Sequence, residues 1–118
     1  MKRGEVYDAS LDPTEGSEQA GIRPVIIVSR DAINKSSPVV LAVPLTTYKP
    51  ERRVYPTHVL IKAPEGGLDR DSIAKAEQVR VLSKSRFLTE RGVLSEETIE
   101  QLNFALLIAL DLPGQEKD

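Results

Sequence analysis

Short apolar segments, each closed off by turn-forming residues, dominate the first two-thirds of the chain. The segments expected to form strands are residues 4–9, 23–28, 39–46, 54–62, 71–74 and 78–82. Runs of this length, rich in valine, isoleucine and leucine and separated by Gly, Pro, Ser and Asp, are typical of a small barrel or sandwich. None is long enough to span a membrane, which needs about 18 consecutive apolar residues. The pattern therefore predicts a mainly β domain.

Two of these strands carry more specific expectations. The continuous β-branched run at 23–28 indicates a buried central strand, and Pro24 stands at its start, where a missing N–H costs least. Pro44 lies near the end of the next strand and suggests an edge or a bulge. Between the two strands, Ser29 is expected to cap a short helical turn that reaches Asn34.

The last third of the chain is expected to be helical. Ser83 would cap a short basic helix at 84–90, which Gly92 would end. Ser95 would cap a longer helix at 96–110 whose first turn holds two glutamates, where the helix dipole favours negative charge. The overall expectation is a mainly β domain with appended helices (α+β) over residues 1–112, followed by a polar tail at 113–118.

The long helix carries more apolar side chains than one buried face requires. One stripe consists of Ile99, Leu102, Leu106 and Ala109. Further apolar side chains widen it: Phe104, Leu107, Ile108 and Leu110. A helix that is apolar on two sides is covered on two sides. The second cover is either a partner subunit, which would make a homodimer, or the rest of a single core.

The formal net charge of −2 is unevenly distributed. Residues 23–86 carry twelve Lys and Arg and six Asp and Glu, a net charge of +6, whereas residues 1–22 carry −3 and residues 87–118 carry −5. The middle of the chain is either a basic surface for a polyanion or a solvated surface with scattered charge. The N-terminus lacks the apolar stretch of a signal peptide, so a cytoplasmic protein is expected.

The residue inventory narrows the chemistry. There is no cysteine and one histidine, His58, so thiolate nucleophiles and sites with two imidazole ligands are excluded. No metal-binding or phosphate-loop spacing occurs, so no cofactor and no metal are expected. The remaining Arg, Thr, Ser and Glu side chains suit attack of a ribose 2′-hydroxyl on its neighbouring phosphodiester, because the substrate then supplies the nucleophile.

Each candidate residue for such a site could instead have a purely structural role. Arg23 opens the buried strand beside a long polar loop and could hold a phosphate or pair with Glu15 or Glu18. Thr46 ends a strand, where threonine is common for its β-propensity alone. His58 is either functional or a strand histidine whose ring is fully hydrogen-bonded.

At these residues the chain resembles the MazF/PemK toxins, the mRNA interferases of toxin–antitoxin systems. The resemblance rests on Arg-Gly-Glu-Val-Tyr at 3–7, Gly-Ser-Glu-Gln-Ala-Gly-Ile-Arg-Pro at 16–24, Val-Pro-Leu-Thr-Thr at 43–47, Pro-Thr-His-Val at 56–59, Arg-Asp-Ser at 70–72 and Glu-Gln-Val-Arg at 77–80. These segments occur in order and cover nearly the whole chain.

The resemblance implies a small SH3-like β-barrel that works as a homodimer in the cytoplasm. It implies metal-independent cleavage of single-stranded RNA at short sequences, leaving 2′,3′-cyclic phosphate and 5′-hydroxyl ends. The catalytic residues would be Arg23 and Thr46. The RNA-binding residues would be Ser17, Glu18, Gln19, Thr47, Arg70, Ser72 and Gln78. The partner would be an antitoxin whose acidic C-terminal segment covers the RNA groove.

Two other functions stay open at this point. A gyrase-poisoning toxin of related fold would act through its terminal helix and would not need Arg23 or Thr46. A non-catalytic barrel that binds RNA or protein would need neither residue for turnover.

Overall fold

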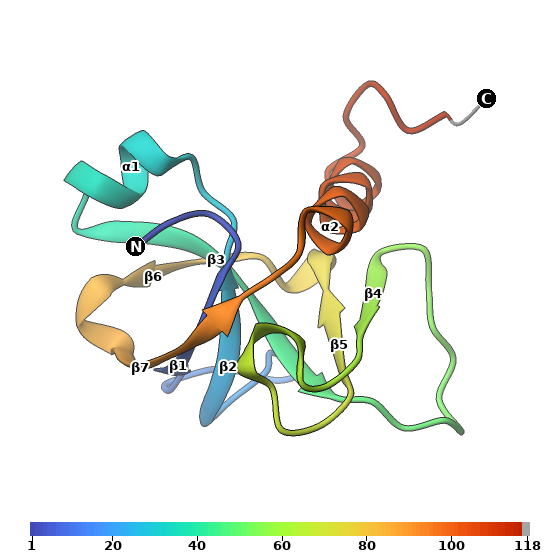
Figure 1. Cartoon of the computed structure of the whole chain (residues 1–118), viewed down its shortest axis with the longest axis horizontal. Coiled ribbons are helices and arrows are strands. Elements are labelled where there is room, and N and C mark those ends of the chain that lie inside the picture. The colour runs from blue at the N-terminus through green and yellow to red at the C-terminus, as the bar shows by residue number, and fades with distance from the viewer. Residues whose placement is uncertain (117–118) are drawn as a thin grey trace.

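The computed structural model describes residues 1–116; positions 117 and 118, the end of the predicted polar tail, lie outside the described residues. The strands are β1 (Glu5–Ser10), β2 (Ile22–Ile27), β3 (Val39–Thr47), β4 (His58–Ile61), β5 (Ser72–Lys75), β6 (Arg80–Ser83) and β7 (Phe87–Val93). The α-helices are α1 (Asp31–Ser36) and α2 (Glu96–Ala109), and the 3-10 turns are η1 (Glu65–Gly67), η2 (Ala76–Gln78) and η3 (Lys84–Arg86). This confirms a mainly β fold with a C-terminal helix (Figure 1).

All strands pair antiparallel in the order β4-β5-β3-β2-β1-β7, and β6 pairs with β3 beside that path. The sheet bends like a barrel but is not closed, since β4 and β7 end the path. Strand β3 changes partner along its length: its first half pairs with β6 up to Ala42, and its second half pairs with β5 from Leu45.

Pro44 lies in the interval where β3 leaves β6 and joins β5. It is buried, and the register with β2 runs unbroken from Ile27↔Ala42 to Val25↔Pro44. The prediction of an edge or a bulge at Pro44 is therefore wrong. The missing N–H is tolerated because it falls between two pairings.

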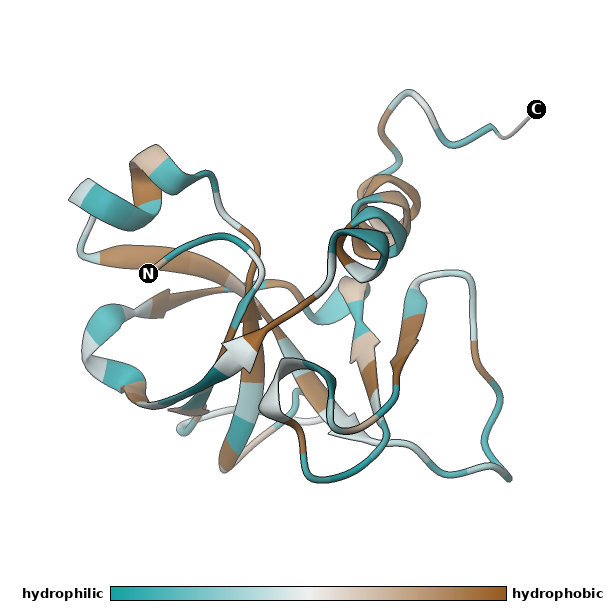
Figure 2. Ribbon diagram, viewed as in Figure 1, coloured by the Kyte–Doolittle hydropathy of each residue, from teal (hydrophilic) through white to brown (hydrophobic). Residues whose placement is uncertain are grey.

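The second half of strand β2, Val25–Ile27, is buried on both faces, as its continuous apolar run predicted. Ile26 belongs to the main core cluster, with Val43, Leu45, Ile61 and Leu102. Its neighbour Val25 belongs to a second cluster with Ala9, Leu11, Ala42 and Leu82. Successive side chains of a strand point to opposite faces, so β2 contributes to both cores. Figure 2 shows the apolar residues concentrated on the strands and on α2.

Helix α2 begins as expected. The Ser95 Oγ accepts a hydrogen bond from the Thr98 N–H (3.2 Å), and Glu65 accepts one from the Ser95 N–H (3.0 Å), so η1 is tied to the helix start. The helix packs on the main core through the predicted stripe, in which Leu102 is buried and the other members are half-buried. Leu110 is 53% exposed, so the wider apolar surface is incompletely covered within one chain.

The predicted basic helix at 84–90 is wrong. Only the turn η3 forms there, and the chain then enters β7, which pairs with β1. Phe87 explains the preference for a strand, because its ring packs edge-to-face on Tyr7 with centroids 5.6 Å apart. Gly92 is not a helix end: a Cβ there would lie 2.8 Å from the Gly66 carbonyl carbon, so glycine permits a close backbone approach.

Two further local predictions need correction. Ser29 does not cap α1; its buried hydroxyl donates to Asn34 Oδ1 and accepts from the Leu41 N–H (3.0 Å), which fastens the helix to β3. The strand expected at 54–62 begins only at His58, because residues 55–58 form a turn in which the His58 N–H donates to the Tyr55 carbonyl (2.8 Å).

Gly67→Ala is expected to destabilise the fold by more than about 2 kcal/mol, since φ is +71° and an added Cβ would lie 2.0 Å from the Arg91 carbonyl oxygen. Gly16→Ala is the matched control, because Gly16 has φ +57° but open space around it, and strain alone costs about 1 kcal/mol. Urea unfolding of both variants makes the comparison. Equal losses would show that the contact with Arg91 is unimportant.

Candidate active site

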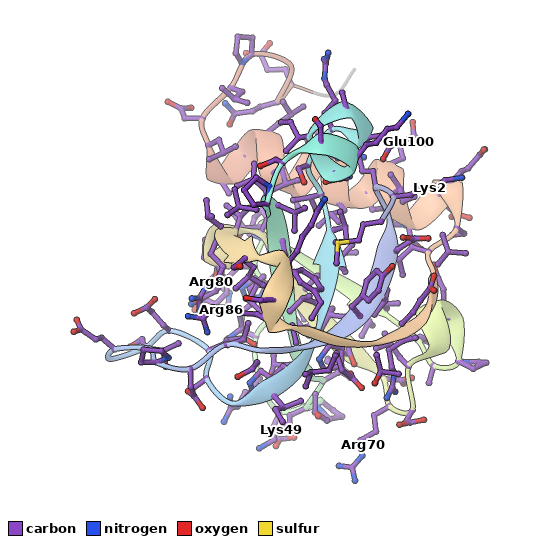
Figure 3. The ribbon with its side chains drawn as sticks, turned by 90° about the vertical axis from the view of Figure 1, so that its left-hand side faces the viewer. Lys2, Lys49, Arg70, Arg80, Arg86 and Glu100 are labelled. Atoms are coloured by element: carbon purple, nitrogen blue, oxygen red, sulfur yellow. The ribbon has the colours of Figure 1, made fainter. Side chains whose placement is uncertain are left out.

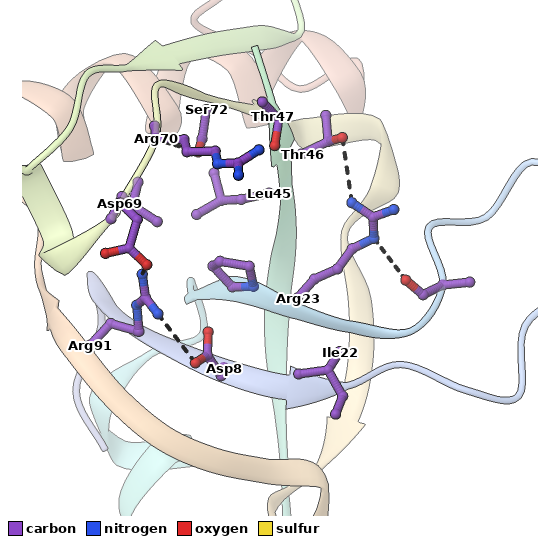
Figure 4. A pocket seen from close by; sticks show the side chains of 13 residues that line it. Asp8, Ile22, Arg23, Leu45, Thr46, Thr47, Asp69, Arg70, Ser72 and Arg91 are labelled. Carbon is purple, nitrogen blue, oxygen red and sulfur yellow. Dashed lines mark hydrogen bonds and ion pairs between the residues drawn. The ribbon is translucent and has the colours of Figure 1, made fainter.

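A cleft of about 490 Å³ opens where β1, β2, β3 and the segment between η1 and β5 meet (Figure 4). Its charged and hydroxyl-bearing lining residues are Asp8, Arg23, Thr46, Thr47, Asp69, Arg70, Ser72 and Arg91. Three of them are arginines and two are aspartates, so the net charge of the lining is positive and favours an anion.

Arg23 and Thr46 face each other across β2 and β3. Continuing the register from Val25↔Pro44 by two residues on each strand places Arg23 opposite Thr46. The Arg23 Nη1 donates to the Thr46 Oγ1 (3.4 Å), and its Nε donates to the Ala20 carbonyl (2.7 Å). The carbonyl of the loop therefore braces the guanidinium. Within the described residues Arg23 makes no ion pair, so the alternative of a bridge to Glu15 or Glu18 is wrong.

Arg91 stands on the opposite side of the cleft, between two carboxylates (Figure 4). Its Nη2 lies 2.9 Å from Asp69 Oδ2 and its Nη1 lies 3.4 Å from Asp8 Oδ2. The hydrogen bond to Asp69 is the main cause that raises the pKa of Arg91, and the charges of Asp8 and Asp69 add to it. Sequence reasoning missed this trio, because the misassigned helix at 84–90 hid the strand that carries Arg91.

The structure brings together five of the nine candidate residues: Arg23, Thr46, Thr47, Arg70 and Ser72 line this cleft. Arg70 is exposed at the rim, whereas Ser72 is 6% exposed and its hydroxyl donates to the Arg70 carbonyl (2.9 Å). Ser72 thereby shapes the turn that carries Arg70.

The other four candidates lie beside the cleft rather than in it. Gln78 clasps the loop between β1 and β2: its Oε1 accepts from the Gln19 N–H (3.5 Å) and its Nε2 donates to the Ser17 carbonyl (3.4 Å). Glu18 Oε1 accepts from the Glu15 N–H (2.8 Å). The side-chain amide of Gln19, unlike its backbone N–H, is buried with no hydrogen-bond partner in the described part of the chain. A buried amide without a partner is costly, and this one belongs to the segment next to Arg23.

Two cations of the basic middle segment hold the base of the same loop (Figure 3). Arg80 Nη1 donates to the Leu11 carbonyl (3.3 Å), and Arg86 Nη1 donates to the carbonyls of Ser10 (3.3 Å) and Asp12. These arginines fix the loop whose other end braces Arg23, so part of the positive block is structural.

His58 is a strand histidine with both ring nitrogens hydrogen-bonded, which is the simpler of the two interpretations of this residue. Its Nδ1 accepts from the Tyr55 N–H (3.2 Å) and its Nε2 lies 3.2 Å from Glu77 Oε2. Among residues 1–116, no group of three or more His, Asp or Glu side chains is placed to hold a metal ion. No helix in that range is long and apolar enough to cross a membrane.

A small bent antiparallel sheet with a C-terminal helix is the fold of one class of toxins from type II toxin–antitoxin systems. Residues 2–110 match the family described as PemK-like, MazF-like toxin of type II toxin-antitoxin system, and the chain belongs to that family. The resemblance seen in the sequence is thereby confirmed.

Individual relatives agree over nearly full length. The chain is 42% identical to Endoribonuclease MazF of Staphylococcus saprophyticus over 112 residues, 95% of this chain and 92% of the relative. A solved mycobacterial endoribonuclease in complex with its cognate antitoxin has a TM-score of 0.80 and 32% identity, covering 96% of this chain and 97% of that one. MazF from Deinococcus radiodurans shares the fold with a TM-score of 0.81 at 23% identity, covering 95% and 97%.

Glu77, the partner of His58, is expected to make stability depend on pH. Burial opposes its charge, but hydrogen bonds from Thr57 Oγ1 (2.8 Å), from its own backbone and from His58 outweigh burial and lower the pKa of Glu77 from 4.5. Since the folded pKa lies below the unfolded one, this stabilisation is complete above about pH 4.5 and is lost as the pH falls through the folded pKa.

The measurement is the free energy of unfolding of the wild type and of Glu77→Gln at pH 7 and at pH 3. The wild type should be more stable than Glu77→Gln at pH 7, and the difference in free energy of unfolding should be smaller at pH 3. Thr57→Val removes one of the hydrogen bonds to Glu77. The pH dependence of its stability should lie between those of the wild type and Glu77→Gln. A difference that does not change with pH contradicts the role given to the carboxylate.

Proposed function

We propose that this chain is a cytoplasmic endoribonuclease toxin that cuts single-stranded RNA at short sequences without a metal ion. The ribose 2′-oxygen attacks the adjacent phosphorus, the bond from phosphorus to the 5′-oxygen breaks, and the proton leaving the 2′-oxygen is balanced by one gained at the 5′-oxygen. The products carry 2′,3′-cyclic phosphate and 5′-hydroxyl ends. The 42% identical relative is named an endoribonuclease, which supports the enzyme class.

The contact between Arg23 and Thr46 carries the proposal. The Arg23 Nε is occupied by the Ala20 carbonyl, which leaves the Nη groups to face the cleft and a bound phosphate. A guanidinium keeps its charge at any physiological pH, so Arg23 stabilises the negative charge that grows on the phosphate oxygens. Because the Thr46 hydroxyl accepts from Arg23, its own proton is free to donate to a phosphate oxygen.

The remaining candidates would hold the RNA strand on either side of that phosphate. Thr47, Arg70 and Ser72 share the cleft with the catalytic pair. Ser17, Glu18 and Gln19 lie in the loop next to Arg23, Gln78 holds that loop from η2, and all four would contact neighbouring nucleotides. Hydroxyl, amide and arginine side chains are the groups that read single-stranded RNA and its backbone.

We infer two partners besides RNA. A relative of this family is solved with its cognate antitoxin, and the arginine-lined cleft would accept the acidic C-terminal segment of such a protein. A second copy of the chain would cover the apolar side chains of Leu110 and Leu112, which are exposed just beyond the end of α2, so we propose a homodimer.

Cleavage is tested by incubating the protein with a long single-stranded RNA in EDTA and mapping the ends. Discrete cuts with cyclic-phosphate ends are expected, and Arg23→Ala or Thr46→Val should slow them by at least ~100-fold if each group supplies ~2.7 kcal/mol to the transition state. Thr46→Ser should recover part of the rate because it restores the hydroxyl.

Arg30→Ala is the control, since Arg30 is an exposed arginine that lines neither the cleft nor the loop. Undiminished cutting by Arg23→Ala would sink the catalytic assignment. Intact RNA together with gyrase-dependent DNA breaks would point to a gyrase poison instead, and neither activity would leave a binding domain.

The dimer is tested by sedimentation at micromolar concentration. The expected species has twice the chain mass of 13.0 kDa, and Leu110→Glu, at the exposed position directly after α2, should shift it toward the monomer. A wild-type species of 13.0 kDa would contradict the homodimer.

A further inference from the structure

A second cleft of about 240 Å³ adjoins the first at the end of β3. Thr46 and Thr47 line both clefts, so an extended ligand at Arg23 needs only to pass these two residues to enter the second. Its other walls come from the segment between β3 and β4, from His58, and from Ile73 and Lys75 of β5.

The lining combines aromatic rings with positive charge. The rings are Tyr48, Tyr55 and His58, and the cations are Lys49, Arg52, Arg53 and Lys75. Among residues 1–116, none of the carboxylates lines the cleft. Aromatic faces beside a row of cations are the means by which proteins hold single-stranded nucleic acid, with bases on the rings and phosphates on the cations.

Tyr55 is the ring best placed for a ligand, since it is 50% exposed. The Arg53 guanidinium lies over it, 5.0 Å from the ring centroid, and the His58 ring meets it edge-to-face at 5.3 Å and 82°. A flat ring flanked by a guanidinium is a stacking platform for a base.

Tyr55 is also anchored before any ligand arrives. Its N–H donates to His58 Nδ1 (3.2 Å), and its carbonyl accepts from the His58 N–H (2.8 Å). A ring nitrogen that accepts carries no proton, so the proton sits on Nε2 and points to Glu77 Oε2 (3.2 Å). The His58 side chain is only 8% exposed, so this arrangement fixes the Tyr55 backbone to β4.

We propose that this second cleft binds one nucleobase of the RNA substrate, next to the nucleotide whose phosphate lies at Arg23 and Thr46. The base stacks on Tyr55, and the cations at the rim hold the flanking phosphate. Tyr55 is then a specificity-determining residue and His58 its positioning residue. The proposal rests on the proposed function. An acidic peptide would use the cations but would give the exposed ring no partner, which favours RNA.

The experiment separates binding from cleavage. Fluorescence anisotropy measures the affinity for all-2′-deoxy oligonucleotides, which cannot be cut because they lack the nucleophile. The sequences are dT12, dA12 and a heptamer of whichever site the cleavage mapping yields. Tyr55→Ala should lower the affinity about tenfold, the loss of one base stack, and Tyr55→Phe should restore it. Leu88→Ala, an exposed apolar side chain of β7 that lines neither cleft, should change nothing.

A cycle with abasic heptamers tests the stack itself. Removing one base from the heptamer should lower the affinity of the wild type about tenfold. The affinity of Tyr55→Ala should be the same for the intact and the abasic heptamer, and so should that of His58→Gln. If Tyr55→Ala lowers the affinity for the intact and the abasic heptamers by the same factor, or does not lower it at all, the base site is overturned. The same holds if Tyr55→Ala weakens only the binding of a decaglutamate peptide.

The two proposals fail separately. Discrete RNA cuts with unchanged binding by Tyr55→Ala overturn the base site and leave the endoribonuclease standing. If no RNA is cut, the proposed function fails, and the dT12 and dA12 affinities of the wild type and Tyr55→Ala still decide whether the second cleft stacks a base.

Discussion

The change of partner along β3 is the constraint on which both clefts depend. Strand β3 pairs with β6 up to Ala42 and with β5 from Leu45. Its last residues therefore lie between β2 and β5. Thr46 and Thr47 therefore end up with Arg23 on one side and with Lys75 and His58 on the other. Pro44 sits at the break, where a residue without an N–H does no harm to either pairing.

The sequence predicted much of this, and the reasons are local. The strand at β2 follows from a continuous β-branched run, and the start of α2 follows from Ser95 with two acids behind it. The contact between Arg23 and Thr46 could not be derived from composition, because it depends on the register between two strands. A slip of one residue would point one of the two side chains to the other face.

The errors arise where tertiary contacts override local preference. Residues 84–90 contain helix formers, yet pairing with β1 and the packing of Phe87 on Tyr7 make most of them a strand. That error concealed Arg91, which lies in the same strand and lines the cleft. The net charge of residues 23–86 likewise did not show what each arginine does. Arg80 and Arg86 bind loop carbonyls, whereas Arg23 and Arg70 line the cleft.

The pairing of β1 with β7 has a consequence for synthesis on the ribosome. Glu5 pairs with Val93, so one edge of β1 has no partner until a strand far later in the sequence has been translated, although its other edge can already pair with β2. Contacts so distant in sequence form late and slowly. Arg91 reaches the cleft only with that strand, so a nascent chain carries an incomplete cleft while it emerges. A toxin built in this way completes its cleft only after the residues of β7 have been translated.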